Sequence, residues 1–174
     1  PLGSHQKEVL AIFPAEGIPL SRVPVVDAPP DTLARFMRGE LRAMVAYESN
    51  EPFRLQQAGV PYHVFRPANY GIRFYGDVLF TSQGLLSDQP RLAVRFREAT
   101  LRGWHYALAN EASVIDLVHQ RYARDRSRAS LAYEADTLRR YIKADLVAVG
   151  HMSRQRWVDI YQHYQDLGMT TAPV

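Results

Sequence analysis

Two short segments carry most of the residues that could recognise a small molecule. In the first, Glu48, Asn50 and Glu51 directly follow the apolar run 43–47. If that run is a buried parallel strand, these side chains stand at its carboxyl end, where ligands of open α/β sheets bind. A carboxylate there can hold an ammonium or guanidinium group. We therefore predict that Glu48, Asn50 and Glu51 contact a ligand that carries positive charge, such as a basic amino acid.

The second segment is 70–77, which reads Tyr-Gly-Ile-Arg-Phe-Tyr-Gly-Asp. Gly71 and Gly76 allow backbone torsions and close approaches that other residues do not allow. The aromatic rings offer flat walls with hydroxyl groups at the rim. The ligand contacts predicted in this segment are Tyr70, Phe74, Tyr75 and Asp77.

Each segment also has a purely structural interpretation. Asn50 and Glu51 could cap the next helix, because Pro52 suits a first helical position and negative charge is favoured at a helix N-terminus. The pairs Tyr70-Gly71 and Tyr75-Gly76 could be ordinary turns whose aromatic rings fill the core. Both alternatives remain open at this stage.

The sequence offers little for catalysis or metal binding. Its histidines form no His-x3-His or His-Glu-x2-His pattern, and it has no glycine-rich phosphate loop and no Gly-x-Ser-x-Gly elbow. Asp116 with His119, and Asp159 with His163, are spaced one helical turn apart, and we predict surface contacts for both pairs. We expect no enzyme activity, no metal and no cofactor in this domain.

Composition sets the outer bounds. The 174 residues are 47% hydrophobic, which is enough for a packed core, and the absence of cysteine excludes a disulfide scaffold and a thiolate zinc site. The 21 basic and 18 acidic side chains are scattered, which argues against a nucleic-acid partner. No apolar run approaches the roughly 20 residues that span a bilayer. Residues 1–5 resemble a protease-site and cloning remnant.

Hydrophobic periodicity divides the chain into an α/β part and a largely helical C-terminal half, over about 85–168. Short helices are predicted at 7–13, ending or kinking at Pro14, and after Asp31, with Gly39 in the closing position. Four short apolar runs between these elements are predicted to form parallel βαβ strands. They are Val23–Val26, Met44–Tyr47, Tyr62–Phe65 and Val78–Thr81.

The C-terminal half predicts four helices. The first starts near Pro90 and has an apolar face formed by Leu92, Phe96, Ala99, Gly103 and Ala107. Two more follow around residues 114–122 and 131–142. Ser153 is predicted to cap the last helix and Gly168 to close it.

Several motifs together resemble periplasmic-binding-protein-like (Venus-flytrap) domains of the branch that binds thiamine-pyrimidine precursors and sulfonates, in particular the sensor type. The stretches that carry the resemblance are Ala15–Ile18, Asn50–Pro52, Tyr70–Gly71, Phe74–Asp77, Phe96–Trp104 and Gly150–Met152. The resemblance implies an α/β, two-lobed type II fold. It also implies that the chain is incomplete at its N-terminus, because family members carry a further segment before the first helix found here.

This resemblance gives the chain a domain plan. Residues 6–69 are expected to form the second lobe as a parallel βαβ segment, and 70–77 the hinge crossover, with Gly71 and Gly76 as the hinge residues. Residues 78–174 are expected to return to the first lobe as a strand and helices. If opening strands are missing, apolar surface is left exposed, so we expect a homodimer formed by exchange of C-terminal helices or lobes.

The resemblance also implies a function. We expect the periplasmic ligand-sensing domain of a bacterial inner-membrane receptor, which binds an amino acid or a related metabolite and controls a cytoplasmic output such as cyclic-di-GMP turnover. A substrate-binding protein of an ABC transporter is the first alternative. An enzyme like the thiamine-pyrimidine synthase is less consistent with the chain, because that enzyme uses a cysteine-rich motif and a pyridoxal phosphate lysine. This sequence has no cysteine, and its lysines are Lys7 and Lys143.

Overall fold

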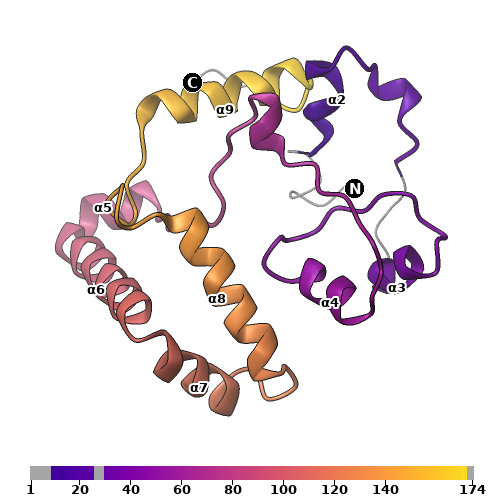
Figure 1. Ribbon diagram of the computed structural model, residues 1–174. Coiled ribbons are helices and arrows are strands. Elements are labelled where there is room, and N and C mark those ends of the chain that lie inside the picture. The colour runs from indigo at the N-terminus through magenta and orange to yellow at the C-terminus, as the bar shows by residue number, and fades with distance from the viewer. Residues whose placement is uncertain (1–8, 26–29, 172–174) are drawn as a thin grey trace. The chain divides into compact units, whose positions relative to one another are not determined.

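A computed structural model describes residues 9–25 and 30–171 of the chain (Figure 1). The described residues divide into two compact units. Unit 1 contains the residues up to Tyr47, Arg54–Tyr75 and the residues from Met152 onward. Unit 2 contains Glu48–Phe53 and Gly76–His151. The chain therefore passes from one unit to the other at Tyr75–Gly76, within the predicted crossover.

Unit 1 is built from short helices around a small apolar core. Its elements are α2 (Ile12–Ala15), η1 (Leu20–Arg22), α3 (Thr32–Met37), the end of α4 (Glu51–Gln57), η2 (Pro67–Tyr70) and α9 (Arg154–Asp166). The core consists of the buried residues Ala11, Ile12 and Ile72, and the last of these is only 1% exposed. Partly buried apolar side chains from both ends of the unit pack against it, namely Val9, Tyr70, Phe74 and Leu167.

The helix ends of unit 1 follow the local sequence. Ser153 caps α9 as predicted, because its Oγ accepts a hydrogen bond of 3.1 Å from the amide of Arg156. Gly168 and Gly39 have φ angles of 65° and 76°, so the left-handed conformation follows α9 and α3 at the predicted glycines. Asp31 precedes α3, but its side chain makes no cap hydrogen bond.

The predicted helix 7–13 begins outside the described residues. Its described part leads into α2, which includes Pro14 and ends at Ala15. The break therefore comes one residue after the proline. A short helix tolerates proline in its first turn because the amide groups there have no partner within the helix.

Unit 2 is helical over most of its described residues. It contains the start of α4, α5 (Gln83–Asp88), α6 (Pro90–Ala109), α7 (Glu111–Arg121) and α8 (Arg128–Ile142). Ser82 and Ser127 cap α5 and α8 with hydrogen bonds of 3.1 Å from the amides of Leu85 and Ser130. The helices predicted for the C-terminal half are thus confirmed, including Pro90 at the first position of α6.

Side chains of α8 contact α6 and α7. The Arg139 guanidinium donates to Glu111, at 2.8 Å, and to the carbonyl of Leu108, also at 2.8 Å. Arg128 at the start of α8 forms an ion pair with Asp116 of α7. These contacts join the end of α6 and the first half of α7 to α8.

The predicted strands are not present as strands among the described residues. Residues 23–25, 44–47, 62–65 and 78–81 have no regular secondary structure, and Val26 lies outside the described part. Extended backbone needs a neighbouring strand to satisfy its amide and carbonyl groups, and no described segment supplies one. Large apolar side chains in these runs stay exposed as a result, such as Phe65 at 64% and Phe80 at 89%. The parallel βαβ arrangement is therefore not confirmed.

Candidate functional site

The acidic segment 48–51 lies in unit 2 and is held by α8. The Tyr141 hydroxyl of α8 donates a hydrogen bond of 2.5 Å to the Glu48 carboxylate. The Asn50 side-chain amide donates to the Glu51 carboxylate at 3.2 Å. Both donors are neutral groups, and they orient the two carboxylates. All three predicted acidic-segment residues are half-buried.

A second tyrosine of α8 extends this arrangement. The rings of Tyr133 and Phe53 lie with their centroids 5.4 Å apart and their planes at 46°. Tyr133 and Tyr141 are eight residues apart on α8, and each contacts a residue of 48–53: Tyr133 contacts Phe53 and Tyr141 contacts Glu48. Sequence analysis missed these tyrosines, although their eight-residue spacing on a predicted helix was a usable signal.

The capping interpretation of this segment also finds support. Glu51 is in the first turn of α4, where its charge interacts favourably with the helix dipole. Asn50 precedes the helix, and its backbone carbonyl accepts a hydrogen bond of 3.2 Å from the amide of Phe53. Ligand contact and helix capping do not exclude each other for Glu51, because a carboxylate has two oxygens and several acceptor sites.

The predicted crossover 70–75 lies in unit 1, where its aromatic residues pack inward. Tyr70 and Phe74 contact the core formed by Ala11, Ile12 and Ile72. The Phe74 ring lies 5.4 Å from the Tyr164 ring of α9. For these two aromatic residues the structure favours the core-filling alternative.

Tyr75 contacts the N-terminal turn of α9. Its hydroxyl accepts a hydrogen bond of 2.7 Å from the amide of Ser153, and its ring lies 5.2 Å from the Trp157 ring. The Arg156 guanidinium lies over the Tyr75 ring, 4.8 Å from its centroid. Both the hydroxyl group and the ring of Tyr75 are therefore in contact with α9 and its capping residue.

The two predicted hinge glycines differ in conformation. Gly71 has φ 80° and closes η2 in the left-handed region, where other residues are strained. Gly76 does not have a positive φ. Gly76 and Asp77 belong to unit 2, and the hinge and the ligand contact of Asp77 remain predictions.

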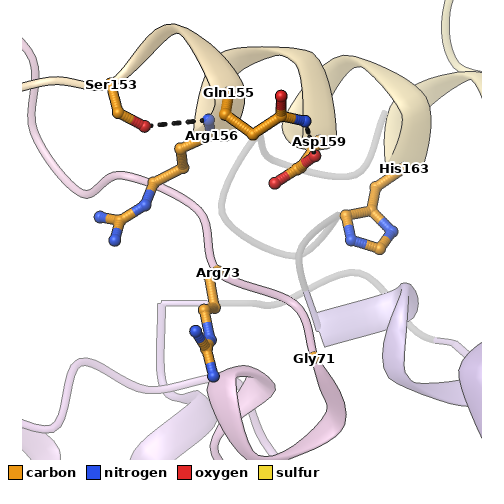
Figure 2. Close-up of a pocket in the computed structure, with 7 residues that line it drawn as sticks. All are labelled: Gly71, Arg73, Ser153, Gln155, Arg156, Asp159 and His163. Atoms are coloured by element: carbon orange, nitrogen blue, oxygen red, sulfur yellow. Dashed lines mark hydrogen bonds between the residues drawn. The ribbon is translucent and has the colours of Figure 1, made fainter.

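A surface hollow of about 310 Å³ lies beside the crossover in unit 1 (Figure 2). Sequence analysis did not predict it, although it includes the pair Asp159 and His163, for which surface contacts were expected. The hollow is lined by Gly71, Arg73, Ser153, Gln155, Arg156, Asp159 and His163.

The polar groups of this hollow do not converge on one point. Figure 2 shows the Arg73 side chain directed away from α9. The Arg156 guanidinium is stacked on Tyr75, and the Gln155 amide donates to Asp159 at 2.8 Å. We therefore assign no ligand to this hollow and treat the acidic segment with α8 as the candidate site.

The part of the chain that the structure describes lacks two other kinds of feature. No cluster of three or more histidine, cysteine or carboxylate side chains that could hold a metal ion occurs there. Within the same residues, none of the helices combines the length and the apolar character needed to cross a membrane.

Comparison with known proteins identifies the family. Residues 2–113, well over half of the chain, match the family described as NMT1/THI5 like. The chain belongs to the NMT1/THI5-like family. The predicted resemblance to the branch that binds thiamine-pyrimidine precursors and sulfonates is thereby confirmed. The matched region includes both 48–51 and 70–77, whereas α8 and α9 lie beyond it.

A curated relative extends the comparison across nearly the whole chain. It is the riboflavin-binding protein RibY of Chloroflexus aurantiacus, which is 25% identical over 172 residues. The alignment covers 95% of this chain and 48% of the relative, so the chain spans about half of the relative's length. No solved structure matches the chain.

Membership of the NMT1/THI5-like family establishes the general character of the chain. The family has a periplasmic-binding-protein-like fold and consists mainly of proteins that bind small molecules. Family membership thus supports the predicted periplasmic-binding-protein-like fold, but not the parallel βαβ strands of the second lobe.

Proposed function

We propose that the chain is part of the periplasmic ligand-sensing domain of a bacterial inner-membrane receptor, and that it binds a small metabolite with a cationic group, such as arginine. Binding would control a cytoplasmic output such as cyclic-di-GMP turnover. Family membership supports the binding of a small molecule. The acidic segment 48–51 with the tyrosines of α8 supports the choice of a cationic ligand.

The observation that carries the ligand class is the hydrogen bond from Tyr141 to Glu48. This bond joins residues 93 positions apart and fixes the Glu48 carboxylate to α8, the helix whose Tyr133 ring packs against Phe53. A fixed carboxylate can form charge-assisted hydrogen bonds to a planar guanidinium group. An aromatic face of this segment could bind the same group through cation–π attraction. Guanidinium fits such a site better than ammonium, because it is planar and more weakly hydrated.

Isothermal titration calorimetry with arginine and with citrulline tests this proposal. Citrulline has nearly the same shape as arginine but carries no charge on its side chain. We expect arginine to bind and citrulline to bind at least tenfold more weakly. Removing one partner of a desolvated charge pair costs roughly 2–5 kcal/mol, so Glu48→Gln or Glu51→Gln should reduce arginine affinity by more than tenfold.

A matched control is Glu98→Gln. Glu98 is exposed on α6 and belongs to no part of the candidate site. Its replacement should leave arginine affinity unchanged. Equal binding of arginine and citrulline, or equal affinity loss in all three variants, would refute the cationic-ligand proposal.

Riboflavin is the second candidate ligand, because the relative that aligns with 95% of the chain is described as riboflavin-binding. Stacking of the isoalloxazine ring on Tyr133 or Phe53 would quench its fluorescence. A saturable quench of riboflavin fluorescence that arginine does not reverse would favour this candidate over the first. A quench reversed by arginine would place both ligands at one site.

Two other functions remain as alternatives. A substrate-binding protein of an ABC transporter would share the fold and the site, and a transmembrane helix in the full-length protein would decide for the receptor. An enzyme like the thiamine-pyrimidine synthase would bind pyridoxal phosphate, which is detected by its absorbance. The family's mainly binding character supports the first alternative more than the second.

A further inference from the structure

We draw no further inference here: the strongest candidate, the exposed surface of α6 that carries Arg91, Arg95 and Arg102 together with Leu92 and Phe96, supports no proposal, because nothing in the described part of the chain shows what covers it.

Discussion

The hydroxyl of Tyr75 accepts a hydrogen bond from the backbone amide of Ser153, at 2.7 Å, across 78 residues of sequence. Ser153 also caps α9, so a single residue links the cap of this helix to the crossover segment. The Trp157 ring packs against the Tyr75 ring one turn further along. The N-terminal turn of α9 is thereby fixed against residues 70–75 within unit 1.

We expect Tyr75→Phe to lower the free energy of unfolding by roughly 0.5–1.5 kcal/mol, the net value of one hydrogen bond. The phenylalanine ring keeps the contact with Trp157, so the loss reports the hydroxyl alone. Urea denaturation followed by circular dichroism measures the change. Tyr122→Phe serves as the control, because Tyr122 is 77% exposed, and this variant should be neutral. Equal effects of the two substitutions would contradict the role of Tyr75.

Position 150 requires glycine for two reasons, its backbone conformation and the closeness of Leu101. It has φ 79°, and an added Cβ would lie 3.0 Å from Leu101 Cδ2. We therefore expect Gly150→Ala to destabilise unit 2 by roughly 1–3 kcal/mol in thermal or urea unfolding. Gly84→Ala is the matched control, because Gly84 lies within α5 and an added Cβ would meet only Ser82 Oγ, at an ordinary contact distance of 3.9 Å. This variant should stabilise the chain by roughly 0.5–1 kcal/mol. A neutral Gly150→Ala would contradict this requirement.

Lys143 follows α8 with φ 48° and ψ 48°, and it is the one non-glycine residue with positive φ among the described residues. Side chains with a Cβ are strained in this conformation by roughly 1–2 kcal/mol. We expect Lys143→Gly to raise the free energy of unfolding by about 1 kcal/mol. Lys143→Ala should bring no such gain, because alanine keeps the Cβ. A gain of the same size in both variants would point to the lysine charge instead.

Glu40 is predicted to titrate below its ordinary range. The hydrogen bond from Arg38 Nε, at 2.5 Å, and that from Arg35 Nε, at 3.2 Å, lower the pKa of its carboxyl group. A lowered carboxyl pKa contributes stability above the unfolded-state pKa, and this contribution is lost as the pH falls through the folded-state pKa. The Glu40 carboxyl group lies at the surface, so we expect its protonation at low pH to lower the melting temperature only slightly.

Carbon-detected NMR titration of the Glu40 side chain measures this shift. Arg38→Ala should raise the pKa of Glu40 toward its ordinary value, since the hydrogen bond from Arg38 is the largest cause of the shift. Arg42→Ala removes an exposed arginine two residues after Glu40 in the sequence and serves as the control. An unchanged titration in Arg38→Ala would contradict the assignment.

Helices were predictable from the sequence because their signals are local. Ser153, Pro90 and Gly168 mark the helix ends by rules that involve only neighbouring residues. The strands were not, because a strand exists only where another segment satisfies its backbone groups. The run 62–65 has a suitable composition, yet no described segment pairs with it.

The candidate site was predictable in part for the same reason. Glu48 and Glu51 were identified from composition and position, but Tyr141 reaches Glu48 from a helix 93 residues later, and no local pattern indicates that contact. Conversely, Phe74 was predicted to contact the ligand because aromatic side chains often line pockets. In the structure its side chain packs against the core of unit 1. Aromatic residues fill cores and line pockets equally well, so residue type alone does not separate the two roles.

The most direct test of the central claim is an amide NMR titration of the chain with arginine. The account predicts shift changes concentrated at residues 48–53 and on α8 around Tyr133 and Tyr141, which saturate with arginine and are absent with citrulline. They should also be lost in Glu51→Gln. Saturable shifts located elsewhere in the chain, or no shifts with a guanidinium ligand, would contradict it.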